Sequence, residues 1–318
     1  MRIKKLSIFS VYISWFICSY AQAAQATQAD TLNYVITKES LLEHLSYLSS
    51  NDLGGRKIAS EGNIMAQKYI INQLVSSSIR PLNNEYQHKF IIKNHFNEIE
   101  GHNIIAMIPG SGNIESYIVL TAHFDHIGKK GNKIYNGADD NASGTSALLA
   151  FGQHLIENPL KHNVILLFTD GEESNLRGAK AFVKDHQRTM SNVVLNINLD
   201  MISGNKRTTK LRFLSRGINN FLSEANIDDL KRLQNSFDIP IKKGFRLKKS
   251  GRQERVNWLM ASDHGIFHRA GIPFIYFGVG THKNYHQQSD TFGNVNHKFF
   301  HMATNAIYQQ LIFIDRNI

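Results

Sequence analysis

The chain has 318 residues, of which 42% are hydrophobic, and a formal net charge of +10. This length and apolar content allow a sizeable buried core, which excludes a disordered or fibrous protein. Cys18 is the only cysteine, so no internal disulfide can form, and zinc sites would need nitrogen and oxygen ligands.

The first residues are typical of an export signal. Three cations within residues 2–5 precede an apolar run over residues 6–20, and small-x-small patterns follow at 21–23 and 24–26. The run is shorter than the ~20 residues of a membrane-spanning helix, so we expect cleavage after residue 23 or 26. The sequence therefore predicts a secreted or periplasmic protein with no stable membrane insertion after cleavage. A retained membrane anchor is the alternative.

From residue 24 onward, apolar residues follow two periods. A four-leucine pattern predicts a helix from residue 38, and a second helix is predicted over 61–75, with Ile64, Tyr69, Ile70 and Leu74 inward. Further helical patterns lie at 143–156, 178–186, 218–237 and 299–314. Apolar runs rich in β-branched residues predict buried strands at 103–108, 117–121, 164–168, 193–197 and 273–277.

The alternation of strands and helices defines the expected fold class. It predicts an α/β protein: a three-layer α/β/α sandwich around a central mixed, mostly parallel twisted sheet. We expect residues 24–318 to form a single domain. Residues 203–255 are the least patterned, and we expect them to be an excursion that borders the active site.

The densest basic stretch lies within this excursion, at 242–255. It contains seven cations and one acid, Glu254. Binding to nucleic acid or to an anionic surface is one interpretation. Because Phe245 is its only aromatic residue and no nucleic-acid module accompanies it, we predict a solvated loop and no nucleic-acid partner.

Acids and histidines follow the predicted strands, at the edge where ligands collect in α/β sheets. These residues are His123, Asp125, Asp139, Asp140, Glu172, Glu173, Asp200 and His286. Each alone is weak evidence, because an Asp before a helix is often an N-cap and adjacent acids are often solvated. Burying so many carboxylates together is costly unless a cation neutralises them. The set therefore suits a pair of zinc ions, and Co²⁺ or Mn²⁺ would accept the same ligands.

In this order the motifs resemble those of the co-catalytic di-zinc exopeptidases. That family contains the bacterial secreted leucyl aminopeptidases, aminopeptidase Y and the glutamate carboxypeptidases. The resemblance begins near residues 45–56, which include Asp52-Leu53-Gly54-Gly55-Arg56, and continues to the C-terminal helix. It implies a zinc-dependent exopeptidase fold and a peptide substrate.

The resemblance also implies a ligand set. Its members are His123, Asp140, Glu173, Asp200 and His286. His123 and Asp200 are expected to bind different zinc ions, with Glu173 completing one site and His286 the other. Asp140 is expected to bridge the ions and to precede a cis peptide bond, because the family's bridging acid lies three residues before the Ser-Gly pair at 143–144. Asp139 is the alternative bridge.

Two further roles follow from the resemblance. Glu172 is expected to be the general base. It would take a proton from a water molecule bound between the two ions, which leaves a hydroxide there, and would pass that proton to the leaving amine. Asp125 is expected to orient the His123 imidazole from the second shell, a turn-forming Asp being the alternative. His126 is not needed to complete the ligand set.

These expectations favour an exported zinc aminopeptidase that hydrolyses N-terminal residues from peptides. A carboxypeptidase, or a glutaminyl cyclase-like acyltransferase using one zinc, is the alternative on the same fold. A non-catalytic binding module is a third interpretation, but such relatives usually lose metal ligands or the base, and this chain retains all of them. No oligomeric state is predicted.

Overall fold

The computed structural model describes residues 35–93, 97–245 and 256–318. The predicted export signal and most of the basic stretch lie outside these residues. Within the described residues, nine strands form one sheet in the order β1-β3-β7-β4-β8-β11-β9-β10, with β2 also pairing with β3. The strands are β1 (Arg80–Pro81), β2 (Gln87–Lys93), β3 (Glu98–Ile108), β4 (Tyr117–His123), β7 (Asn163–Thr169), β8 (Val193–Leu199), β9 (Leu211–Arg216), β10 (Ile241–Lys243) and β11 (Phe274–Gly278). A separate hairpin joins β5 (Gly128–Lys130) to β6 (Lys133–Tyr135).

The centre of the sheet is parallel, which brings several strand ends to one edge. The strands β7, β4, β8 and β11 run in the same direction. The strand β3 pairs antiparallel with β7 on one side, and β9 pairs antiparallel with β11 on the other. The expected mixed α/β sheet is therefore confirmed, with antiparallel pairing flanking the parallel centre.

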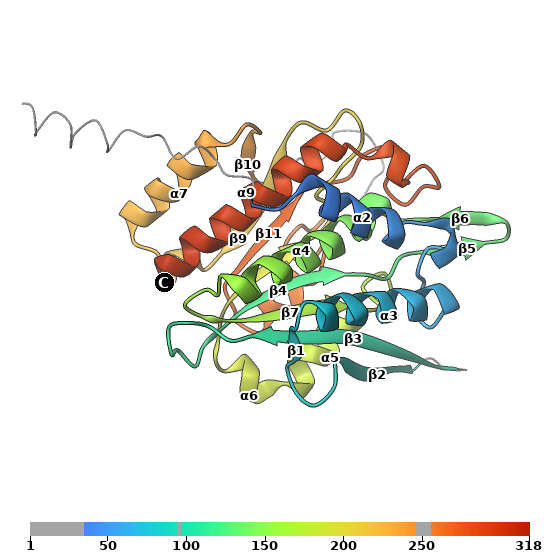
Figure 1. Cartoon of the computed structure of the whole chain (residues 1–318), viewed down its shortest axis with the longest axis horizontal. Coiled ribbons are helices and arrows are strands. Elements are labelled where there is room, and N and C mark those ends of the chain that lie inside the picture. Colours follow the sequence, from blue (N-terminus) through green and yellow to red (C-terminus); the bar gives the residue numbers. More distant parts are fainter. Residues whose placement is uncertain (1–34, 94–96, 246–255) are drawn as a thin grey trace, which may run out of the picture. The chain divides into compact units, whose positions relative to one another are not determined.

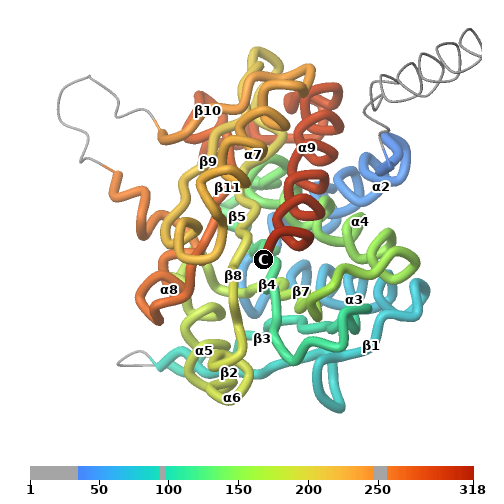
Figure 2. Tube along the Cα trace, turned by 90° about the vertical axis from the view of Figure 1, so that its left-hand side faces the viewer, coloured from blue at the N-terminus to red at the C-terminus, as the bar shows by residue number. Residues whose placement is uncertain are grey.

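Helices cover both faces of this sheet (Figures 1 and 2). One face carries α2 (Lys38–Leu48), α3 (Glu61–Ser76), α4 (Gly144–Glu157) and α9 (His297–Arg316). The other carries α5 (Arg177–Asp185), α6 (Gln187–Met190) and α8 (His264–Arg269). The helix α7 (Glu224–Ser236) packs against α9. Within the described residues, no helix is both long enough and apolar enough to cross a membrane.

Four of the eight described α-helices begin where the sequence offers a capping side chain. Thr37, Ser60, Ser223 and Asn296 each accept a hydrogen bond from the backbone N–H three residues later, which satisfies a donor that the first helical turn leaves free. Because Ser223 caps α7, that helix begins at Glu224. The single helix predicted over 218–237 is therefore divided into the short 3-10 turn Ile218–Asn220 and α7.

One sequence expectation differs from the structure at the surface. Ile64 was expected to point inward but is 46% exposed on α3, because the inward stripe of that helix consists of Ala66, Ile70 and Leu74. Residues 203–255, the least patterned stretch, contribute β9, α7 and β10, and two of these are strands of the main sheet.

Candidate metal centre

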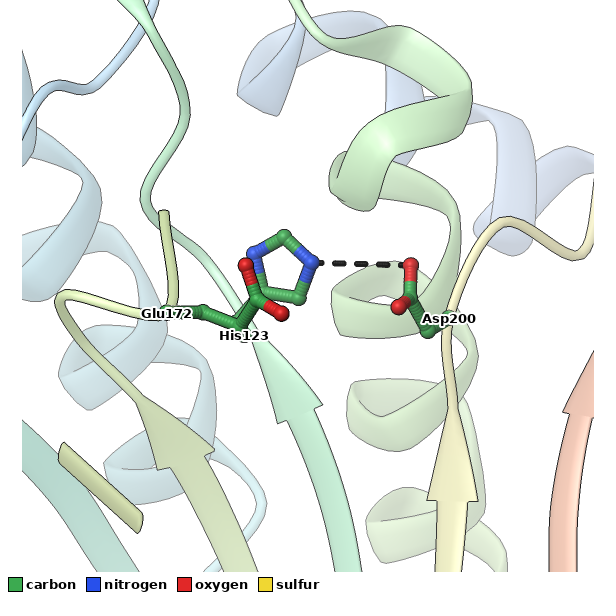
Figure 3. Close-up of side chains that lie close together, drawn as sticks. All are labelled: His123, Glu172 and Asp200. Atoms are coloured by element: carbon green, nitrogen blue, oxygen red, sulfur yellow. Dashed lines mark ion pairs between the residues drawn. The ribbon is translucent and has the colours of Figure 1, made fainter. Parts of the chain in front are cut away.

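The acids and histidines singled out in the sequence meet at the carboxyl edge of the parallel strands. His123 ends β4, Glu172 follows β7, and Asp200 follows β8. Figure 3 shows these three side chains converging above neighbouring strands, with Asp200 facing one edge of the His123 ring and the Glu172 carboxylate overlapping the ring in this view. Because β4 lies between β7 and β8 in the sheet, its last residue can reach groups from both neighbours.

Asp140 reaches the same place from the kinked segment Ala138–Ser143 before α4, in which Asp140 and Asn141 have non-helical backbone angles. Gly137 directly precedes this segment, and its φ is +61°. A side chain does not fit at this position, because a Cβ would lie 2.2 Å from the carbonyl oxygen of Asp140. Gly144 allows close packing at the other end, since its Cβ would lie 2.3 Å from the carbonyl oxygen of Leu199. The peptide bond between Asp140 and Asn141 is cis, as expected.

One group of donor atoms surrounds His123. Its Nε2 lies 3.4 Å from Oδ1 of Asp140 and 3.5 Å from Oδ1 of Asp200. Ligand atoms of His123, Glu172 and Asp200 all lie within 4.8 Å of one another. All of these side chains except Glu172 are almost completely buried.

A second group lies on the other oxygen of Asp140. The Nε2 atom of His286 is 3.2 Å from Oδ2 of Asp140 and 3.3 Å from Oε1 of Glu173. The Nδ1 atom of His126 lies 2.9 Å from the same Glu173 oxygen and 3.7 Å from the same Asp140 oxygen. The two oxygens of Asp140 thus face two different donor groups.

The expected division of the ligands differs from this arrangement. His123 and Asp200 were expected to serve different ions, but they lie together on the Oδ1 side of Asp140, while Glu173 and His286 lie on the Oδ2 side. The cause is the strand order. The neighbouring strands β4 and β8 end side by side, and chain order does not reveal that pairing.

Several buried atoms in the two groups lack hydrogen-bond partners among the described residues. They are Asp140 Oδ2, Glu173 Oε1, Asp200 Oδ1 and both ring nitrogens of His126. Buried polar atoms left without partners are costly, and acids this close repel one another. Cations bound at these nitrogen and oxygen donors would satisfy them, so the residues fit zinc.

The electrostatics of the pocket follow from burial and crowding of the acids. Burial raises the pKa of Glu172 well above its usual range, and the nearby Asp200, Asp263 and Glu173 act in the same direction. Burial alone would lower the pKa of His123, but Glu172 and its hydrogen-bonding carboxylates outweigh it and hold that pKa well above 6.5. The proton affinity of these two side chains is therefore set by burial together with the charges of their neighbours.

Asp125 holds two parts of the site together. Its carboxylate accepts hydrogen bonds from the backbone N–H groups of Glu172, at 3.0 Å, and Glu173, at 3.3 Å. The His123 Nδ1 atom lies closer to the Asp125 carbonyl oxygen, at 3.1 Å, than to its carboxylate, at 3.7 Å. Asp125 thus contacts the His123 imidazole with its backbone carbonyl oxygen. The Asp125 carboxylate instead orders the turn after β7.

Asp139, the alternative bridge, points elsewhere. Its Oδ1 accepts hydrogen bonds from the backbone N–H groups of Ser203 and Gly204, and its Oδ2 lies 2.7 Å from Nε2 of His282. Asp290 in turn accepts the backbone N–H groups of Asp139, at 2.9 Å, and Asp140, at 3.1 Å. Asp139 and Asp290 therefore order the loops around the two donor groups.

Arg56 has a role that the sequence analysis did not assign. It is fully buried, and its guanidinium donates hydrogen bonds to the carbonyl oxygens of Leu48, Phe124, Asn136 and Gly137. Two of these carbonyls flank the segments that carry His123 and Asp140. The only sequence signal was its place in the Gly-Gly-Arg stretch at 54–56.

A cavity of about 170 Å³ lies against the first donor group. Its lining includes His123, Glu172 and Asp200, and also Val256, Trp258 and Tyr276. Trp258 and Tyr276 are held by stacking, since the Phe245 ring lies 4.4 Å from one and 4.9 Å from the other. The geometry provides a small chamber lined partly by acids and histidines and partly by apolar and aromatic side chains.

Residues 103–311, which include every ligand named above, match the profile of peptidase family M28. The chain belongs to peptidase family M28. Two curated sequences resemble this M28 chain. It is 24% identical over 289 residues to a "Probable leucine aminopeptidase" of Arthroderma otae, covering 85% of this chain and 70% of that protein. It is 25% identical over 216 residues to a "Probable zinc metalloprotease" of Pyrenophora tritici-repentis, covering 59% of this chain but 44% of that protein.

Solved structures share the fold of this M28 protein. A Zn-dependent exopeptidase from Parabacteroides distasonis aligns with a TM-score of 0.66 at 16% identity, covering 87% of this chain and 98% of that one. A glutaminyl cyclase from Porphyromonas gingivalis aligns with a TM-score of 0.64 at 17% identity, covering 89% and 99%. The expected resemblance, the α/β fold and the assignment as a metallo-exopeptidase are confirmed.

Proposed function

We propose that this M28 peptidase is an exported aminopeptidase that binds two zinc ions and releases N-terminal residues from peptides. The observation that carries the proposal is the position of Asp140 between two donor groups, with Oδ1 facing His123 and Oδ2 facing His286. One group would consist of His123, Asp140 and Asp200. The other would consist of Asp140, Glu173 and His286.

The chemistry divides between the ions and the chain. Zinc ions held there would supply Lewis acidity toward a carbonyl and toward water. The carboxylate of Glu172 would accept a proton from the attacking water and donate it to the leaving nitrogen. The hydrogen bond from the Glu172 N–H to Asp125 fixes the backbone of this base.

The described lining of the cavity offers no cation to a substrate carboxylate. It includes Asp140, Glu172 and Asp200, and none of its described residues is Lys or Arg. Zinc ions bound at Asp140 and Asp200 would neutralise these ligands, but a carboxypeptidase would still need a Lys or Arg here to pair with the C-terminal carboxylate of its substrate. The lack of such a side chain among the described lining residues supports an aminopeptidase over a carboxypeptidase.

Export is a separate part of the proposal. It rests on the basic start, the apolar run at 6–20 and the small-x-small patterns at 21–26. Secretion of the full chain from a bacterial host, with N-terminal sequencing of the recovered protein, tests it. A recovered protein that begins at residue 24 or 27 supports export, and one that retains residues 6–20 argues for a membrane anchor.

The activity is tested with purified protein and added zinc. A panel of aminoacyl-p-nitroanilides would be assayed beside the same compounds acetylated at the amine, and beside a peptide with N-terminal glutamine whose cyclisation is followed by mass. We expect release only from free amines, and its loss in Glu172→Gln. Cyclisation without hydrolysis would identify a glutaminyl cyclase-like acyltransferase, and two bound ions without any turnover would contradict the proposal.

A further inference from the structure

A second cavity, of about 410 Å³, lies between the segment after β8 and the segment that carries His286. Three cations line it, Lys206, Arg207 and Lys283, together with the side-chain amides of residues 205, 284 and 294. None of the described residues that line it is acidic. Its composition is thus opposite in charge to that of the cavity over the candidate metal centre.

None of these three cations forms an ion pair with another residue in the described part of the chain. The backbone around them is ordered: the Lys206 N–H donates to the Asn294 carbonyl, and the Arg207 N–H donates to the side chain of Asn205. The charged ends are exposed while their supporting loops are fixed. Such an arrangement offers a preformed set of donors for an anion, and guanidinium suits a carboxylate well.

This second cavity is built on the scaffold of the candidate metal centre. Asp139, the neighbour of Asp140, accepts the N–H groups of Ser203 and Gly204 from one wall segment and pairs with His282 from the other. The two segments that form the cavity walls are therefore both hydrogen-bonded to Asp139, which is the residue next to the proposed ligand Asp140. Their positions relative to the donor groups are fixed by buried hydrogen bonds.

The second cavity is within reach of a short extended peptide. Lys283 lies three residues before His286, so their Cα atoms are at most about 11 Å apart. An extended peptide advances about 3.3 Å per residue. A substrate whose scissile bond lies at the donor groups can therefore span this distance within about three residues after that bond.

We infer that the second cavity is a carboxylate subsite, which binds acidic groups of the substrate on the C-terminal side of the scissile bond. The inference rests on the proposed aminopeptidase function. The shared ligand chemistry is a carboxylate, which comes either from the C-terminus of a short peptide or from an Asp or Glu side chain. The protein would then prefer short or acidic peptides over neutral ones.

Three peptides distinguish these cases: Leu-Gly-Gly amide, Leu-Gly-Gly with a free carboxylate, and Leu-Gly-Asp amide. We expect the two acidic peptides to have a KM about three- to tenfold lower than the neutral amide, because screened contacts to exposed cations are individually weak. Preference for the free acid alone would identify the C-terminus as the source, and preference for both would include side chains. Equal KM values for all three peptides would overturn the inference.

Variants test whether the preference for acidic peptides arises from the second cavity. Lys283→Ala and the double change Lys206→Ala with Arg207→Ala should remove the preference, while Lys184→Ala on α5 keeps it. Leucyl-p-nitroanilide lacks any carboxylate beyond the scissile bond, so its hydrolysis reports an intact active site in each variant. A preference that persists in both cavity variants would contradict the assignment.

The inference and the proposed function fail in different ways. Absence of leucyl-p-nitroanilide hydrolysis by the unaltered enzyme would count against the function. Binding is then measured by calorimetry with the zinc-loaded Glu172→Gln enzyme and the same three peptides. Tighter binding of the acidic peptides supports the subsite without turnover, and equal Kd values overturn it.

Discussion

The carboxylate of Asp125 accepts a hydrogen bond from the backbone N–H of Glu172 over 3.0 Å. Asp125, two residues after the end of β4, thus fixes the turn after β7 with a buried carboxylate. The next N–H, that of Glu173, donates to the other oxygen. A proposed base and a proposed ligand are therefore held by one side chain.

We predict that Asp125→Asn lowers kcat about 10- to 100-fold, the usual range for losing an outer-shell partner. The amide keeps the size of the carboxylate but can accept only through one oxygen, so one of the two N–H groups loses its partner. Steady-state kinetics on an aminoacyl-p-nitroanilide measure the effect. An unchanged kcat would show that the turn after β7 needs no such support.

Metal content should separate Asp140 from its neighbour. We predict that Asp140→Asn binds almost no zinc, because its two oxygens face both donor groups, whereas His286→Ala keeps one of two ions. Asp139→Asn should keep both, since its oxygens are occupied by Ser203, Gly204 and His282. Atomic absorption on desalted proteins gives the ratio of zinc to chain. Retention of both ions by Asp140→Asn would remove the basis of the bridging assignment.

Arg56→Met should destabilise the protein by at least about 3 kcal/mol, because it leaves four buried carbonyl oxygens without their donor. Burial lowers the pKa of Arg56 to about 10, so the side chain is charged at neutral pH. The matched control is Lys57→Met, since Lys57 is the next residue and is exposed. Urea unfolding measures both variants, and equal midpoints would contradict the prediction.

The stability of the protein should depend on pH through His264. Burial lowers its pKa to about 4, while an unfolded chain titrates near the ordinary value of about 6.5. Between these values the unfolded state binds the extra proton, so the contribution is present above pH 6.5 and is lost as pH falls toward 4. It amounts to roughly 3 kcal/mol.

The variant His264→Phe tests this pH dependence, because it preserves stacking on Tyr276 but cannot titrate. Both proteins would be unfolded by urea in chelator at a series of pH values. The difference in unfolding free energy between wild type and variant should shift against the wild type as pH falls from 6.5 to 4. A difference that is constant over this range would show that His264 does not titrate in that interval.

The sequence predicted the centre of the sheet better than its edges. Central strands such as β4 and β7 are buried on both faces, so they appear as continuous apolar runs. The strand β2 alternates buried and exposed residues and ends in Lys93, while β10 has only three residues, two of them exposed lysines. Such edge strands form because a neighbour pairs with them, and their own residues carry little signal.

The candidate site shows a similar limit. The residue types and their places after strands pointed to one shared edge, because that argument needs only the direction of parallel strands. The grouping of the ligands into two donor groups depends on the order of the strands in the sheet. The sequence order β4, β7, β8 differs from the spatial order β7, β4, β8. The hydrogen bonds of Arg56 and Asp139 were equally hidden, since their partners are mostly backbone groups far along the chain.

The proposed ligands extend along the chain from His123 to His286 and come from separate strands and loops. An unfolded chain has no such cluster, so any ion bound there ties these segments to one another and its binding energy adds to the stability of the folded state. The supply of metal in the surroundings would then control how long each molecule survives heat and proteolysis, in addition to how fast it works.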